Sequence, residues 1–125
     1  MDGPTSYDED MTDCLFCRIV EGEIPATVVA DTDDVLAFRD ITPKAPTHVL
    51  VIPKAHYANA AELAAADPAL AGRLIDVAGT IATSEGVAED GYRLMFNTGR
   101  HGGQEVFHVH LHLLGGTPLG PMLAI

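Results

Sequence analysis

Three histidines alternate with apolar residues within residues 106–114, and this run is typical of a β-strand. Successive side chains of an extended strand point to opposite faces, so His108, His110 and His112 are predicted to share one face. The other face is predicted to pack into a core through Phe107, Val109, Leu111 and Leu113. Imidazole changes its protonation near neutral pH, and a row of three suits nucleophilic, acid–base or metal chemistry. The strict period of two argues against a histidine-rich strand that merely faces solvent.

Apolar spacing and turn residues predict the remaining elements. A short helix is expected over residues 14–21, strands over 28–30, 35–38, 48–52 and 92–97, and a weaker helix over 58–66. A longer helix is expected to begin at Asp67 as N-cap, with Pro68 in its first turn, and to end near Gly86. Its apolar stripe consists of Leu70, Leu74, Val77, Ala78 and Ile81. Because strands and helices do not alternate regularly, the predicted fold class is α+β, with a mainly antiparallel five-stranded sheet and two or three helices.

Length and charge restrict the classes of protein further. The 125 residues allow one domain, expected over 13–125 behind a disordered acidic tail of residues 1–12. A net charge of −11 argues against nucleic acid as a partner, and no apolar run reaches the roughly 18 residues of a membrane span. No apolar leader opens the sequence, and its two cysteines, Cys14 and Cys17, cannot build a disulfide framework. We therefore expect a cytoplasmic protein whose Cys-x-x-Cys pair serves metal or redox chemistry.

The loop before the histidine run contains Gly102 and Gly103, which allow a backbone to approach a ligand closely and to turn amides toward an anion. An ordinary hairpin turn would explain the pair equally well if it stood alone. Beside three imidazoles, it favours a site for a phosphoryl group. His110 is the natural nucleophile because it has a histidine on either side, and attack on phosphorus would give a phosphohistidine-type intermediate.

Several motifs together resemble one family. They are the His-x-His-x-His run at 108–112 with the apolar residues after it, and the segments 38–43, 45–54, 92–97, 114–116 and 119–122. Over about residues 14–123 the chain resembles the histidine-triad (HIT) family, and within it the Hint branch of purine nucleoside phosphoramidases. The resemblance implies a HIT-like fold and a homodimer whose two sheets join into one.

The resemblance also implies an activity and a site. The activity is hydrolysis of the P–N bond of purine nucleoside 5′-phosphoramidates, such as AMP amides and AMP–lysine conjugates, through a nucleotidyl-histidine at His110 and without a catalytic cofactor. His48, His108 and His112 would assist His110. The purine would contact Leu15, Phe16, Ile19, Phe38 and Ile41, all of which could instead be plain core residues. Asp40 would bind the ribose hydroxyls, and the phosphate would be bordered by Asn97, Gly103, Gln104, Glu105, Val106 and His112.

The resemblance further implies a structural zinc site formed by Cys14, Cys17, His56 and His108. Two thiolates and two imidazoles are a suitable tetrahedral set for zinc. The alternative is a reduced cysteine pair without metal, in which case His108 stays in the catalytic row. His101, in the loop, is expected to be a surface residue.

Two positions depart from the family pattern, and two other functions stay open. Glu105 stands where many Hint proteins have Ser, and Thr117 stands where an Arg is common. A negative side chain at 105 would oppose an anionic phosphate unless it is turned away or protonated, and we interpret it as tuning the activity. A dinucleoside polyphosphate hydrolase is one alternative, although the chain has no long extension after the triad. A nucleotide-binding regulatory module with weak catalysis is the other.

Overall fold

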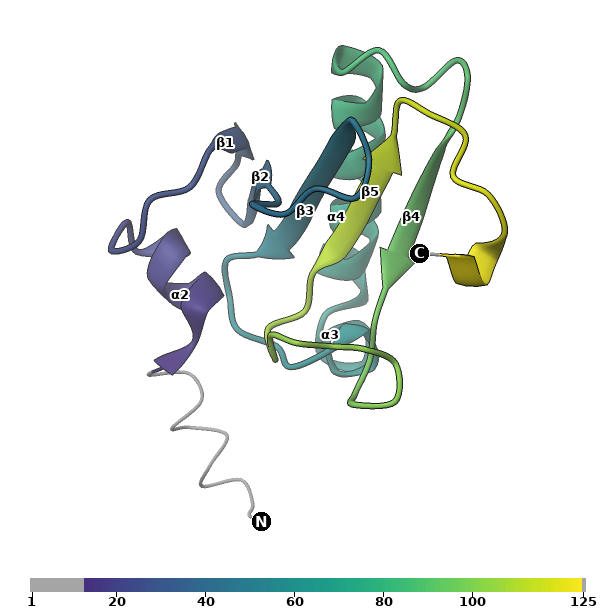
Figure 1. Cartoon of the computed structure of the whole chain (residues 1–125). Helices are drawn as coiled ribbons and strands as arrows, with labels where there is room; N and C mark the ends of the chain where they lie inside the picture. The colour runs from purple at the N-terminus through teal and green to yellow at the C-terminus, as the bar shows by residue number, and fades with distance from the viewer. Residues whose placement is uncertain (1–12, 125) are drawn as a thin grey trace.

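The computed structural model describes residues 13–124, and its five strands form one antiparallel sheet (Figure 1). The strands lie in the order β1-β2-β3-β5-β4, and every neighbouring pair is antiparallel. Their bounds are β1 (Val28–Asp31), β2 (Val35–Arg39), β3 (Thr47–Pro53), β4 (Tyr92–Phe96) and β5 (Leu111–Gly115). The predicted α+β class with a five-stranded antiparallel sheet is confirmed. The predicted disordered tail, residues 1–12, lies outside the described residues.

Three helices in the described part of the chain accompany the sheet: α2 (Leu15–Val20), α3 (Ala60–Ala66) and α4 (Pro68–Ser84), with a short 3-10 turn at Met122–Ala124. Asp67 caps α4 by accepting a hydrogen bond from the Leu70 amide at 3.1 Å, as its sequence predicted. Gly86 follows the end of α4 with a φ of 77°, which a residue with a Cβ adopts only under strain. None of the helices within residues 13–124 is both long and apolar enough to cross a membrane.

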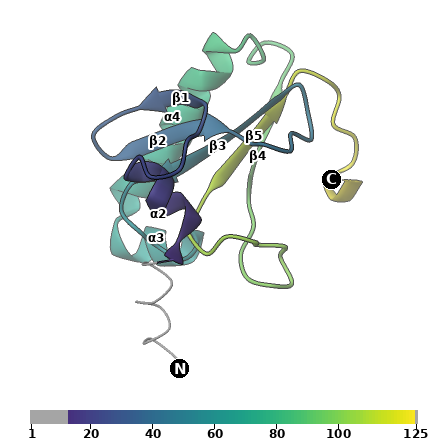
Figure 2. The ribbon, with the colours of Figure 1, turned by 60° about the vertical axis from the view of Figure 1, so that its left-hand side comes forward.

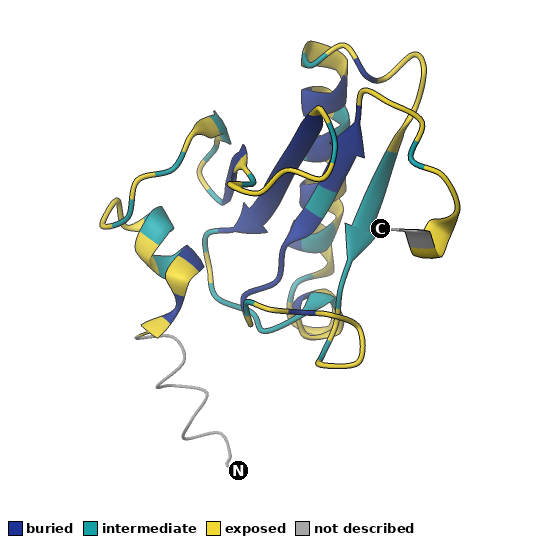
Figure 3. Cartoon of the chain, viewed as in Figure 1, coloured by how far each residue is buried: buried dark blue, intermediate teal, exposed yellow. Residues whose placement is uncertain are grey.

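Alternating side chains divide the core between the two faces of the sheet. On one face α4 and α3 cover Val35 and Ala37 of β2 and the corresponding residues of β3 and β5, and this layer is thoroughly buried (Figure 3). On the other face a smaller core joins α2 to Leu36 and Phe38 of β2 and to Leu50 and Ile52 of β3. Figure 2 shows α2 on the near side of the sheet and α4 behind it. The short α2 covers only part of its face, and this leaves room for a site.

Strand register places the functional side chains on the α2 face. Phe38 of β2 pairs with Leu50 of β3, and Leu50 pairs with His112 of β5. Met95 of the edge strand β4 completes this row opposite His112. His48 lies two residues from Leu50 along β3, so it shares the face of His112.

The histidine run differs from the expected strand in two ways. β5 begins only at Leu111, because residues 106–110 do not pair with a neighbouring strand, and the Val109 amide instead donates to the Tyr57 carbonyl at 2.7 Å. Val109, Leu111 and Leu113 reach the larger core as predicted, but the prediction for Phe107 was wrong, since 47% of this residue is exposed. A strand alternation cannot be extended through a segment whose backbone leaves the sheet.

Candidate functional site

A chain of hydrogen bonds fixes the orientation of His48 and His112. The Lys44 amide donates to His48 Nδ1 at 3.1 Å, so the proton of a neutral His48 lies on Nε2. That Nε2–H donates to His112 Nδ1 at 2.9 Å, which leaves the proton of His112 on its own Nε2. These proton positions follow from the hydrogen-bond network. His112 therefore offers an N–H donor to whatever binds beside it.

His110 is held with the opposite tautomer. Its Nδ1–H donates to the backbone carbonyl of His108 at 2.8 Å, which leaves a lone pair on Nε2. The His110 ring lies 5.0 Å from the His112 ring and 5.1 Å from the edge-on Phe16 ring, measured between centroids. Although His110 is only 9% exposed, it lines two cavities. Its geometry is that of a neutral imidazole prepared to act as a nucleophile or base.

Burial keeps these imidazoles neutral. It lowers the pKa of His112 to about 4, with the neighbouring His110 and His48 rings acting in the same direction. Burial also lowers the pKa of His48, against the opposing effect of the Asp40 carboxylate. The pKa of His110 is lowered by burial too, while its bond to the His108 carbonyl and the charges of Asp40 and Glu105 oppose the change. Near pH 7 the three rings are therefore neutral: His48 and His112 act as N–H donors through Nε2, and His110 has a lone pair on Nε2.

Two cavities meet at His110 and His112. The apolar cavity, of about 360 Å³, lies between α2 and the sheet, and its walls include Phe16, Ile19, Phe38, Leu50 and Val106. The histidine cavity, of about 330 Å³, lies toward β4 and is bordered by Asn97, Gly102, Gly103, His48 and Lys44. Asp40, Thr42 and Glu105 line both. An apolar chamber joined to a polar one suits a ligand with a flat apolar part and a charged part.

Nearly all the residues predicted to contact a nucleotide line one of these cavities. Leu15, Phe16, Ile19, Phe38, Ile41 and Val106 line the apolar cavity, although Ile41 is 94% exposed in the single chain. Gln104 lines neither cavity: its amide group is buried, donating to the Ala58 carbonyl at 2.6 Å and the Val106 carbonyl at 3.1 Å. Its Oε1 accepts from the Gly99 amide at 2.9 Å. The side chain of Gln104 thus holds the loop in place from behind.

The glycine loop is closed mainly by its own hydrogen bonds. The amides of Gly103 and Gln104 donate to the carbonyls of Arg100 and Gly99, at 3.1 and 3.0 Å. A Cβ at Gly102 would lie 2.4 Å from the Thr98 carbonyl oxygen, so a tight backbone contact requires glycine there. Within residues 13–124, no hydrogen bond uses the amides of Glu105 and Val106. These two amides remain available to an anion at the cavity wall.

Several cavity residues were not anticipated from the sequence. Leu50 lies between the paired residues Phe38 and His112, so the two-residue period from His48 could have identified it. Thr42 donates from its amide and its hydroxyl to Asp40 Oδ1, at 2.8 and 3.2 Å, an Asx-turn that the Asp-x-Thr spacing allows. Lys44 acts through its backbone amide, for which no side-chain signal exists. The further residues in the wall of the apolar cavity are Ile24, Pro25, Ala26 and Arg39.

The predicted metal ligands come together beside this site. Cys14 Sγ lies 3.4 Å from His108 Nδ1, and Cys17 Sγ lies 3.4 Å from His56 Nδ1. The four ligand atoms all lie within 4.8 Å of one another. His108 Nε2–H donates to the Pro53 carbonyl at 2.8 Å, so the lone pair on Nδ1 faces the two sulfurs, as in metal-bound histidines. This cluster could hold a metal ion.

Without a metal, the His108 ring is ready to act as a ligand, whereas the Cys17 thiol keeps its proton. Burial lowers the pKa of His108 to about 4, so its ring is neutral and can act as a ligand. Burial and the adjacent Cys14 raise the pKa of the Cys17 thiol to about 12. Thiols in such surroundings deprotonate readily only beside a cation, which a bound metal would supply.

A second group, Asp40, His48 and His112, also has its ligand atoms within 4.8 Å of one another. The Lys44 amide already occupies His48 Nδ1, so His48 Nε2 keeps its proton and has no lone pair to offer a metal. The short contacts of this group are instead explained by the hydrogen bond from His48 to His112 and by the 3.5 Å approach of Asp40 Oδ2 to His48 Nε2.

Comparison with known proteins places the fold and the site in one family. The HIT domain family model matches residues 21–119, and this chain belongs to the HIT family. A curated relative from Escherichia coli K12, named purine nucleoside phosphoramidase, is 56% identical over 88% of this chain and 92% of its own length. A protein from Zea mays, named 14 kDa zinc-binding protein, is 46% identical over 86% of this chain and 84% of its own length.

Solved structures agree with this assignment. The crystal structure of a HIT family hydrolase from Legionella pneumophila superposes with a TM-score of 0.83 at 52% identity, covering 86% of this chain and 96% of that one. At this level of similarity both the fold and the arrangement of its elements are shared.

Proposed function

We propose that this protein hydrolyses the P–N bond of purine nucleoside 5′-phosphoramidates, with His110 as the nucleophile. The observation that carries the proposal is the bond from His110 Nδ1–H to the His108 carbonyl, because it leaves the Nε2 lone pair at the junction of the two cavities. The name and the 56% identity of the Escherichia coli relative support the choice of substrate.

The reaction would proceed in two balanced steps. His110 Nε2 attacks the phosphorus, forming an N–P bond, while the bond from phosphorus to the protonated leaving nitrogen breaks and an amine departs with the electron pair. The ring becomes positively charged, and its Nδ1–H bond to the His108 carbonyl, already 2.8 Å long, stabilises that charge. Water then attacks the phosphorus and loses a proton to the solvent, while the bond from phosphorus to Nε2 breaks and its electron pair returns to the ring; the nucleoside monophosphate leaves and His110 is neutral again. His112 Nε2–H would donate to a phosphoryl oxygen in both steps.

The two cavities suggest how a purine nucleotide would lie. The base would fill the apolar cavity against the wall formed by Phe16 and Phe38, whose rings contact each other edge-to-face with their centroids 5.4 Å apart. Asp40 would accept hydrogen bonds from the ribose hydroxyls, since Thr42 occupies only its Oδ1. The phosphate would accept hydrogen bonds from the amides of Glu105, which lines both cavities, and Val106, which lines the apolar cavity.

We further propose that the metal cluster binds a structural zinc ion. Cys14, Cys17, His56 and His108 are a suitable donor set for zinc, and the zinc-binding name of the Zea mays relative supports the choice. The ion would tie the start of α2 to the segments after β3 and before β5 and would leave His110 and His112 for catalysis. Reduced thiols are stable in the cytoplasm, which is the compartment we propose.

We also propose a homodimer in which two copies of β4 pair across a shared axis. Both β1 and β4 are edge strands, but β1 contains a register shift between Val28 and Ala30, which disturbs its outer hydrogen-bonding row. β4 is regular, and Tyr92 at its start is exposed. A regular, uncovered edge is the better template for a second copy. Sedimentation at micromolar concentration, with Leu94→Pro as an edge-breaking variant, tests this proposal.

The experiment that tests the activity compares two substrates and a product control. Purified protein is incubated with adenosine 5′-phosphoramidate, with diadenosine tetraphosphate and with AMP alone as a product control, and released AMP is followed. The proposal predicts rapid release from the phosphoramidate and much slower release from the dinucleotide. Binding of AMP without turnover of either substrate would indicate a nucleotide-binding module instead.

A further inference from the structure

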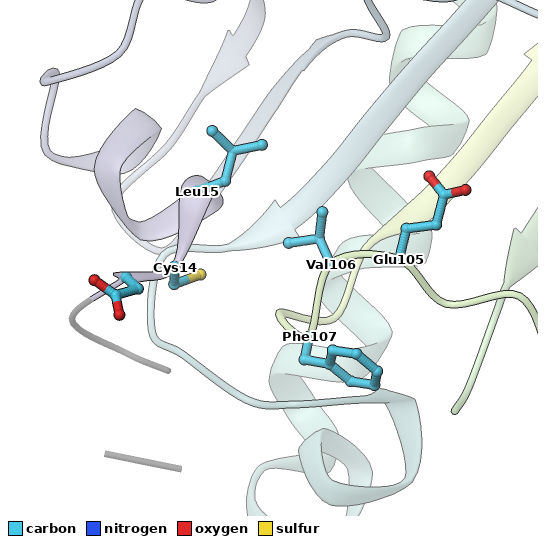
Figure 4. Close-up of a pocket in the computed structure, with 6 residues that line it drawn as sticks. Cys14, Leu15, Glu105, Val106 and Phe107 are labelled. Atoms are coloured by element: carbon cyan, nitrogen blue, oxygen red, sulfur yellow. The ribbon is translucent and has the colours of Figure 1, made fainter. Parts of the chain in front are cut away.

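Glu105 occupies a position that no other charged residue within 13–124 shares. It lines the apolar cavity, the histidine cavity and a third space of about 230 Å³ between the start of α2 and residues 105–107. We call this third space the α2 groove; it is lined by Asp13, Cys14, Leu15, Glu105, Val106 and Phe107. Figure 4 shows Glu105 at the opposite end of the groove from Cys14, with its carboxylate directed away from Phe107.

The Glu105 carboxylate is exposed and uncompensated. The ion pairs within residues 13–124 do not include it, and an exposed glutamate is negatively charged near pH 7. In the histidine cavity Asp40 is a second carboxylate, and Lys44 is the opposing cation. Among the residues that the structure describes, the wall of the α2 groove has Asp13 as a second acid and no basic residue. Both spaces beside the apolar cavity are therefore negative on balance.

The negative charge of Glu105 affects the leaving group of the reaction. The proposed function does not specify which amine this leaving group is. With the base in the apolar cavity and the phosphorus beside His110, two spaces are open to the leaving group: the histidine cavity, which His110 also lines, and the α2 groove, which shares Leu15, Glu105 and Val106 with the apolar cavity. Glu105 lines both, so either path brings the leaving group near its carboxylate. A carboxylate attracts a cationic group there and repels an anionic one.

We infer that Glu105 is a specificity-determining residue that favours phosphoramidates of cationic amines and disfavours anionic leaving groups. The inference rests on the proposed function, because it concerns the leaving group of that reaction. It also gives a physical reason for an acid beside a phosphate site: Glu105 weakens binding of the nucleotide anion but selects the amine attached to it. Polyphosphate leaving groups, which are strongly anionic, would be disfavoured by the same charge.

Three amides of AMP that share the same P–N bond test the inference. Their amines are ethylenediamine, which carries a second, cationic nitrogen, propylamine, which is neutral, and glycine, which carries a carboxylate. The measured quantity is the ratio of kcat/KM for the ethylenediamine amide to that for the glycine amide, because a general change in activity cancels in this ratio. The wild-type protein should prefer the cationic substrate.

Glu105→Gln should reduce the preference. An exposed charge pair changes each rate constant by roughly two- to fivefold, so the ratio should fall by roughly tenfold. Glu105→Asp, which keeps the charge, should retain most of the preference. Glu89→Gln removes an exposed acid that lines none of the three spaces, and it should leave the ratio unchanged. The wild-type ratio should also shrink in 1 M salt, where the Debye length is about 3 Å.

The outcomes separate the two proposals. If the wild-type protein releases AMP from none of the three amides, the proposed function is wrong. If it releases AMP but the ratio is the same in wild type and Glu105→Gln, the proposed function survives and Glu105 has no role in selection. If Glu89→Gln lowered the kcat/KM ratio as much as Glu105→Gln, the preference would come from the net charge of the protein, and the inference would likewise be overturned.

Discussion

His48 Nε2 lies 2.9 Å from His112 Nδ1, and the Lys44 amide on the far side of His48 determines which of the two nitrogens carries the proton. A backbone N–H in the loop before β3 therefore sets, through His48, the tautomer of His112 on β5. The consequence is that His112 presents Nε2–H, and not a lone pair, to the cavity. His48 is therefore a positioning residue, because it acts on the substrate only through His112.

Replacing His48 by Phe should release His112 from this orientation. The variant fills the space of the buried ring but cannot donate to His112 Nδ1, so His112 becomes free to protonate either nitrogen. We expect kcat for adenosine 5′-phosphoramidate to fall by about tenfold or more, with a smaller change in KM. Nitrogen NMR of the His112 ring is the decisive readout: the wild type should show the Nε2–H tautomer and the variant a mixture. An unchanged tautomer with lower kcat would assign His48 a purely structural role.

The lowered pKa of His112 makes stability depend on pH. In the unfolded chain a histidine titrates near pH 6.5, whereas in the folded protein His112 resists protonation until about pH 4. Between these values the unfolded state binds more protons, so the free energy of unfolding decreases as the pH falls, by at most about 1.4 kcal/mol per pH unit for this group.

Urea unfolding at pH 7.5 and pH 5 measures this effect. His112→Gln removes the titrating group, and its stability should fall less between the two pH values than that of the wild type. An identical loss in both proteins would show that His112 titrates normally in the folded state.

Removal of the zinc ion that we propose should loosen the contact of α2 with the sheet. We expect about one zinc ion per purified chain, lost in Cys17→Ser together with several degrees of Tm, because binding to the folded state stabilises it. Metal content by mass spectrometry and thermal unfolding with and without chelator check both points. His101→Ala, which changes an exposed histidine outside the cluster, serves as the control. Zinc-free protein with a chelator-insensitive Tm would return His108 to the catalytic row.

Asp40→Ala should weaken ribonucleotides more than deoxyribonucleotides. A hydrogen bond to a charged acceptor is worth roughly 1.5–3 kcal/mol, so loss of the ribose contact should cost AMP about tenfold or more in Kd. 2′-deoxy-AMP, which lacks one hydroxyl, should lose less, and the two affinities should approach each other. Calorimetric titration of both nucleotides into both proteins measures the difference. An unchanged ratio would mean that Asp40 does not recognise the ribose.

The sequence predicted the sheet and the helices well because periodicity and capping are local. Asp67, Pro68 and Gly86 bounded α4, and the apolar run that Pro53 closes identified β3, whereas the site role of His48 came from the family resemblance. The two-residue period failed before Leu111, since residues 106–110 follow contacts with Tyr57 and with the cysteine pair that are distant in sequence. The family resemblance supplied the metal set, which spacing alone could not have joined to His56.

Other features could not be predicted because they depend on backbone position. The Lys44 amide that orients His48 and the buried role of the Gln104 side chain have no signature in residue type. The same applies to the glycine loop: the amides of Gly103 and Gln104 close the loop, and those of Glu105 and Val106 remain available. Such assignments require knowledge of where each N–H points.

The nucleophilic role of His110 is the central claim, and single-turnover kinetics of His110→Ala with adenosine 5′-phosphoramidate tests it most directly. The small side chain removes the only group proposed to form the bond to phosphorus, so the rate should fall by several orders of magnitude, while AMP still binds through the apolar cavity and Asp40. Rapid quenching of the wild type should in addition trap a nucleotide on this one histidine. Near-normal turnover by the variant, with AMP binding intact, would contradict the account.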